Sequence, residues 1–110
     1  MADPAVRAAV KASLAALQQI APGHAVEIRV PPYAAVQAVP GHRHRRGTPA
    51  AVVETDADTW LGLVHGEVTW AQAVDSGRLH ASGERSDLSE YLPLPPSAMT
   101  TRSDSIPTKR

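Results

Sequence analysis

Residues 54–83 read ETDADTWLGLVHGEVTWAQAVDSGRLHASG, and this stretch decides the fold. One of the two aspartates within residues 56–58 can cap a helix whose apolar positions run up to Gly66, where the chain can turn back. The tetrapeptide TWAQ, which begins at Thr69, has the spacing of a capping box and predicts a second short helix. Residues 78–82 then predict a strand. The stretch therefore predicts two short helices followed by a strand.

Upstream of this stretch, the N-terminal segment predicts an amphipathic helix that ends at Ile20. Asp3 can act as its N-cap, and Pro4 suits the first helical position. One apolar stripe recurs along it at steps of three and four residues, formed by Val6, Val10, Leu14 and Leu17. Such a helix needs an apolar surface to pack against.

Three segments between this helix and the deciding stretch predict strands: 24–30, 33–39 and 50–54. In the first, Val26, Ile28 and Val30 alternate with charged residues, which is typical of a strand with one wet face. Residues 40–49 are bracketed by Gly and Pro and predict an exposed loop.

Downstream, Ser86 and Asp87 are expected to cap a last short helix that contains Leu88, Tyr91 and Leu92 and ends at Pro93. The tail from residue 95 onward is rich in Pro, Ser, Thr and charges, which indicates disorder. We therefore expect one domain over residues 1–94 and a disordered tail over residues 95–110. The mixed order of helices and strands predicts an α/β (α+β) fold.

Composition narrows the function classes. The chain has 110 residues, 11 basic and 11 acidic, and no cysteine. A disulfide scaffold, a zinc site with cysteine ligands and a thiol nucleophile are therefore excluded. No apolar run approaches the roughly 18 residues of a membrane span, and no secretory signal is visible. We expect a small soluble protein of the cytoplasm.

The most prominent polar feature of the sequence is the basic cluster from His42 to Arg46, HRHRR. It is compatible with a solvated loop, with contact to a phosphate or an anionic lipid head group, or with metal binding by its two histidines. The absence of a nearby carboxylate disfavours a metal ion, and the lack of interleaved aromatic residues disfavours nucleic acid.

Catalytic motifs are missing. The chain contains neither the Gly-x-Ser-x-Gly elbow nor the His-Glu-x-x-His helix. Glu54, Asp56 and Asp58 form an acidic group, but acidic residues at a helix start also complement the helix dipole. His65 and His80 each stand alone. We therefore expect a protein that is not an enzyme and that needs no cofactor.

The two tryptophans leave two interpretations open. Trp60 and Trp70 fall on the two predicted short helices and share faces with aliphatic residues. In a domain without Phe they can be the main fillers of the core. Alternatively, they line an apolar cavity that accepts an acyl chain or a ring system.

Several motifs together resemble the sterol carrier protein (type 2) family. The residues that carry the resemblance are the acidic start at Asp56, the apolar helix that ends at Gly66, the second short helix, and the segment GRLHASG over residues 77–83. More narrowly, the chain is similar to the short sterol-carrier-like proteins of actinobacteria, through PYAAVQ at residues 32–37, RGTP at 46–49 and VVETD at 52–56. The resemblance covers about residues 5–94.

This resemblance implies a sheet of four to five strands covered on one face by short helices, with an apolar ligand cavity between the layers. It implies non-catalytic binding of a fatty acyl or sterol-like molecule. The residues expected near the cavity are Leu14, Leu17, Trp60, Leu61, Val64, Trp70, Val74, Leu79, Leu88, Tyr91 and Leu92. Arg43, Arg45 and Arg46 are expected at its mouth, where they could meet a carboxylate or phosphate head group.

The resemblance also implies an alternative. The same fold forms the C-terminal part of mycothiol-dependent maleylpyruvate isomerase-like enzymes, where it supports another domain. The chain could then be an accessory domain with a protein partner, or a homodimer, without lipid transport. In contrast to larger relatives, which close the cavity with an apolar C-terminal helix, this chain becomes polar after Leu94.

Overall fold

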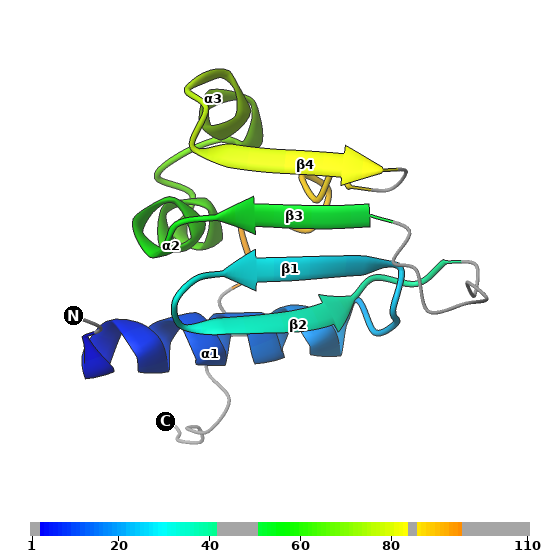
Figure 1. The fold of residues 1–110 in the computed structure, drawn as a ribbon. Helices are drawn as coiled ribbons and strands as arrows, with labels where there is room; N and C mark the ends of the chain where they lie inside the picture. The colour runs from blue at the N-terminus through cyan, green and yellow to red at the C-terminus, as the bar shows by residue number, and fades with distance from the viewer. Residues whose placement is uncertain (1–2, 42–50, 84–85, 96–110) are drawn as a thin grey trace, which may run out of the picture.

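The computed structural model describes residues 3–41, 51–83 and 86–95. These ranges contain three helices and four strands, and Figure 1 labels them in chain order. The elements are α1 (Pro4–Ile20), β1 (Val26–Val30), β2 (Ala34–Ala38), β3 (Ala51–Thr55), α2 (Ala57–His65), α3 (Trp70–Asp75) and β4 (Leu79–Gly83). Every element of the deciding stretch is therefore present, and within these ranges no helix combines the length and apolarity needed to cross a bilayer.

The strands form one mixed sheet in the order β2-β1-β3-β4. β1 pairs with β2 in antiparallel and with β3 in parallel register, and β3 pairs with β4 in antiparallel register. The α+β class and a strand count within the expected range are thus confirmed.

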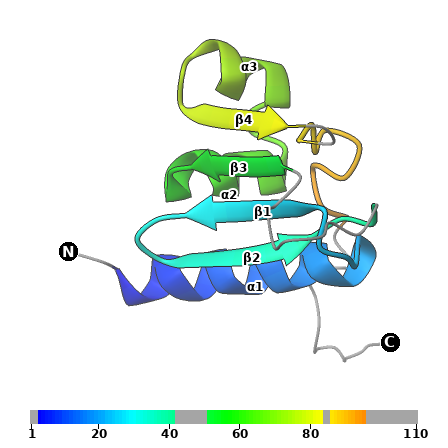
Figure 2. The same ribbon diagram turned by 45° about the vertical axis from the view of Figure 1, so that its right-hand side comes forward.

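One face of the sheet is dry. Val26, Ile28 and Val30 of β1 have no exposed surface, whereas Arg29 between them is exposed. Figures 1 and 2 show α1, α2 and the segment 86–95 on the dry side, while α3 lies beside the outer edge of β4. The residues of β1 therefore alternate as predicted, with every second side chain in the core and the others on the uncovered face of the sheet.

Helix α1 begins and packs as its sequence predicts. Asp3 accepts a hydrogen bond from the backbone N–H of Ala5 at its side chain (2.8 Å), and Pro4 occupies the first turn. The stripe Val10, Leu14 and Leu17 is fully buried. Because α1 contacts both α2 and β2, this stripe supplies much of the core.

One polar chain of hydrogen bonds crosses this apolar core. The indole Nε1–H of Trp60 on α2 donates to the Ser13 hydroxyl on α1 (2.7 Å), which donates in turn to the Val10 carbonyl (2.8 Å). Trp60 and Ser13 have no exposed surface. Buried polar groups are costly when they lack partners, and these two hydrogen bonds give Trp60 and Ser13 the partners they need. They also set where α2 lies on α1.

Asp56 starts α2 and carries a perturbed carboxyl. Its side chain accepts hydrogen bonds from the backbone N–H of Thr59 (3.0 Å) and from the Thr59 hydroxyl (2.7 Å). Burial acts to raise the pKa of Asp56, but the Thr59 bonds and the charge of Arg78 outweigh it, so the pKa lies below its usual value of 3.8. The ionised carboxylate is therefore the form that the folded state favours.

The prediction of a last helix after Asp87 is wrong. Residues 86–95 form no helix; instead a single turn closes with the N–H of Tyr91 donating to the Leu88 carbonyl (2.9 Å), and Asp87 accepts from the N–H of Ser89 (2.9 Å). Six residues before a proline are too few to nucleate a stable helix. Burial of Leu88 and Leu94 in the core holds the segment instead.

Several expectations fall on parts of the chain outside the described residues. They are most of the loop 40–49, Ala50 at the start of the third predicted strand, and the tail from residue 96 onward.

We expect the Ser13→Ala substitution to lower the free energy of unfolding by about 1–3 kcal/mol, because it leaves the buried indole N–H without a partner. Urea unfolding of the purified protein measures this change. In a Trp60→Phe background, which has no such donor, the same substitution should have almost no effect. Equal losses in the two backgrounds would show that the bond contributes nothing.

We also expect the contribution of Asp56 to stability to depend on pH. Because the folded state lowers the pKa of Asp56, its stabilisation is fully present above the usual value of 3.8 and is lost as the pH falls through the lower folded value. Asp56→Asn should therefore be less stable than the wild type near neutral pH, and the gap should close below about pH 3.8. Unfolding curves for both proteins across this range measure it. A gap that stays constant with pH would contradict this assignment.

Candidate functional site

An apolar hollow of about 250 Å³ lies where the end of α2, the start of α3 and the segment 89–93 meet. We call it the Trp70 hollow. Most of its lining is apolar, and the remaining residues are a glycine and two residues with hydroxyls. The lining residues are Leu63, Gly66, Val68, Thr69, Trp70, Ser89, Leu92 and Pro93.

The turn after α2 forms the first wall. Gly66 ends the helix with a left-handed backbone (φ 80°, ψ 15°), a conformation that glycine adopts without steric cost. The backbone N–H groups of Glu67 and Val68 then both donate to the Gly62 carbonyl (2.8 and 3.2 Å). This compact turn places Val68 against α2 and directs the chain into α3.

The start of α3 forms the second wall. Thr69 accepts a hydrogen bond from the Gln72 N–H at its hydroxyl (3.1 Å), and the Gln72 side chain accepts one from the Thr69 N–H (2.9 Å). The predicted capping box is therefore confirmed. It fixes Trp70, the first residue of a helix of only six residues, at the edge of the hollow.

The segment 89–93 forms the third wall. It is held to α2 by a hydrogen bond from the N–H of Leu94 to the Val64 carbonyl (3.1 Å). Pro93 also lies close to Gly66, because a Cβ placed on that glycine would be 3.5 Å from its ring. Residues far apart in the sequence are thus brought together around one apolar space.

The structure brings two of the residues predicted for the ligand site, Trp70 and Leu92, to this hollow. Leu61 and Tyr91 are half-buried and lie outside its lining, and Val74 is 41% exposed on α3. The remaining predicted residues lie in the hydrophobic core: Leu14, Leu17, Trp60, Val64, Leu79 and Leu88. Arg43, Arg45 and Arg46 are outside the described residues.

The buried position of Trp60 supports the interpretation of this tryptophan as a filler of the core. A side chain with no exposed surface touches no void large enough for water, and Trp60, Leu14 and Leu17 all have none. At these side chains the space between sheet and helices is filled by protein. Trp60 is a core filler, whereas Trp70 borders the hollow.

Sequence reasoning missed Leu63, Val68 and Pro93 as lining residues. A signal for Val68 exists, because an apolar residue just before an N-cap commonly packs on the helix that follows, and Ala73 offers the buried position one turn on. Pro93 carries no such local signal, since its place depends on the long-range bond from Leu94.

The lining limits the chemistry of the hollow. None of its eight described residues is ionisable, and its side-chain polar groups are the hydroxyls of Thr69 and Ser89 and the indole N–H of Trp70. Across the described ranges, no three His, Asp or Glu side chains come together as ligands for a metal ion. Such a lining can bury apolar surface and offer a hydroxyl hydrogen bond.

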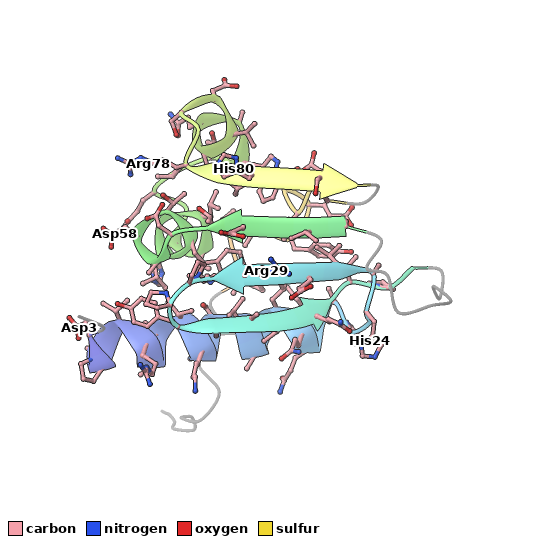
Figure 3. The ribbon with its side chains drawn as sticks, viewed as in Figure 1. Asp3, His24, Arg29, Asp58, Arg78 and His80 are labelled. Carbon is pink, nitrogen blue, oxygen red and sulfur yellow. The ribbon has the colours of Figure 1, made fainter. Side chains whose placement is uncertain are left out.

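A second, wider hollow of about 400 Å³ lies at the β1–β2 turn, where its lining reaches Arg29 and Glu54. Arg29 pairs there with Glu27 (Nε to Oε2, 3.1 Å) and more loosely with Glu54 (Nη1 to Oε1, 3.9 Å). Figure 3 shows Arg29 and His80 on the uncovered face of the sheet. Because its charged groups already pair with one another, it is less suited to an apolar ligand than the Trp70 hollow.

Comparison with protein families gives one result that bears on function. A family model described as the bacterial SCP orthologue matches residues 3–94, which include every described helix and strand and all eight lining residues of the Trp70 hollow. A search of curated proteins found no match.

We expect Gly66→Ala to lower the free energy of unfolding by about 1 kcal/mol, because an alanine pays a steric cost in the left-handed conformation. Gly66→Asn should recover part of this loss, since asparagine tolerates that conformation better. Thermal unfolding of both variants measures the difference. An Asn variant no more stable than the Ala variant would show that contact with Pro93, not backbone conformation, sets the cost.

Proposed function

Because the chain belongs to the family of bacterial orthologues of the sterol carrier protein, we propose that it binds a small apolar molecule, without catalysis, in the Trp70 hollow. Family membership supports a role in lipid binding. The observation that carries the location is the lining itself, which presents Trp70, Leu92 and Val68 without an ionisable group. Apolar concave sites with a few hydroxyls bind such ligands through burial of surface alone.

The size of the hollow sets the class of ligand. Its volume of about 250 Å³ lies below the roughly 300–1,000 Å³ of sites that enclose most of a drug-sized molecule. The occupant that fits is a segment of an alkyl or acyl chain, or a small ring system, with its polar end outside. A whole sterol is too large to be enclosed there.

The expected affinity is modest. About eight methylenes buried at about 0.8 kcal/mol each give about 6 kcal/mol, which corresponds to a Kd of tens of micromolar at best. The free-energy cost of ordering and association raises the expected Kd toward the millimolar range for a ligand with one short alkyl chain. Binding assays should therefore use soluble probes at high concentration.

Titration with bromooctanol, whose bromine quenches indole on contact, tests the proposal. We expect saturable quenching in the wild type and no quenching in Trp70→Phe, because the remaining Trp60 has no exposed surface and lies outside the hollow. Leu92→Ala should weaken binding by about tenfold through lost apolar contact. Ile20→Ala, a matched change at a 40% exposed residue at the end of α1, should have no effect.

Two results would contradict the proposal. Unquenched wild-type emission at millimolar bromooctanol would remove the binding function. Saturable quenching of Trp60 in the Trp70→Phe variant would place the ligand in the interior and not in the Trp70 hollow.

A further inference from the structure

We infer that the ligand of the Trp70 hollow has an uncharged or positively charged polar end, such as an alcohol, ester, amide or amine, and not a carboxylate or phosphate. The inference rests on the proposed function and concerns which member of the lipid class the hollow accepts. Three observations carry it: the groups that line the hollow, the charges beside it, and the place of the nearest basic side chains.

The lining offers no counter-charge to an anion. Its polar side-chain groups are the hydroxyls of Thr69 and Ser89 and the indole N–H of Trp70, and none of them carries a charge. The hydroxyls can donate and accept hydrogen bonds, although that of Thr69 already accepts one from the Gln72 N–H, so a hydroxyl, ester or amide of the ligand can pair with them. A carboxylate at the same place would give up part of its hydration without a cation to replace it, which is unfavourable.

The charges beside the hollow are acidic. Glu67 lies between the lining residues Gly66 and Val68, and Glu90 follows the lining residue Ser89. Both carboxylates are exposed residues, as are Asp75 on α3 and Asp87 before the turn. Over residues 54–83 and 86–95, seven carboxylates stand against one guanidinium. An anionic group at the mouth therefore meets a repulsive field within about one Debye length.

The arginine and lysine side chains of the described residues lie elsewhere. Arg78, the one Arg or Lys of residues 54–83 and 86–95, lowers the pKa of Asp56 and thus lies near the start of α2, and Figure 3 shows it near Asp58. The hollow is at the other end of that nine-residue helix, about 13 Å away. Arg7 and Lys11 border a separate hollow on α1. His65 is the imidazole that ends α2 beside the mouth.

Three probes with the same eight-carbon chain separate the possibilities: octanol, octylamine and octanoate. Near neutral pH and at low salt, we expect octanol and octylamine to shift the Trp70 emission saturably. Octanoate should bind at least about fivefold more weakly, because several carboxylates repel it across about 10 Å. Addition of salt to about 1 M should narrow this difference, since it screens exposed charges.

Variants assign the effect to the named carboxylates. Glu67→Gln combined with Glu90→Gln should narrow the gap between octanol and octanoate to about twofold and leave octanol binding unchanged. Both residues are exposed, so the double variant should fold normally. Asp58→Asn is the matched control, because it removes an exposed carboxylate at the far end of α2 and should leave the fivefold gap intact.

Each outcome has one meaning. Octanoate that binds as tightly as octanol, as expected if the arginines of segment 43–46 receive an anionic head group, would overturn this inference and leave the proposed function standing. A gap that persists unchanged in the double variant would also overturn it. Failure of all three probes to shift Trp70 would overturn the proposed function itself.

Discussion

The hydrogen bond from the Trp60 indole to the Ser13 hydroxyl fixes the geometry on which the rest of this structure depends. The two residues are 47 positions apart and join α1 to α2 inside an apolar core. Without phenylalanine, the core relies on Trp60 as its largest buried side chain. A directional bond therefore sets how α2 lies on α1. The end of α2 in turn sets where Gly66 turns the chain and where the Trp70 hollow forms.

The two tryptophans take different positions in this small chain, one in the core and one at the Trp70 hollow. Trp60 is fully buried and bonds to α1, whereas Trp70 begins a six-residue helix at the edge of the sheet and is only half-buried. With the interior filled at Trp60, Leu14 and Leu17, the Trp70 hollow offers about 250 Å³ of apolar space between α2, α3 and residues 89–93. A space of this volume suits a chain segment or a small ring system better than a whole sterol.

Local signals in the sequence predicted most of the fold. The N-cap at Asp3, the capping box at Thr69 and the glycine after His65 each act within one helical turn, so their outcome depends little on distant residues. The expected helix after Asp87 failed for the opposite reason. Its segment is too short to be helical alone, and distant contacts of Leu88 and Leu94 decide its shape.

The same distinction explains the candidate site. Trp70 and Leu92 could be named from their apolar character, but the hollow exists only because residues 89–93 return to the end of α2 through the bond from Leu94 to Val64. No periodicity in the sequence encodes that return. Periodicity likewise could not separate a tryptophan in the core from one at a rim, because both positions share their helix face with aliphatic residues.

The uncovered face of the sheet has an evolutionary consequence. Along β1, each residue that points to the helices is confined by packing, while its neighbours Glu27 and Arg29 meet water and satisfy one another. Selection for stability therefore acts on every second position of the strand and leaves the others free to drift. Members of the family could acquire different partners on that side without disturbing either the interior or the Trp70 hollow.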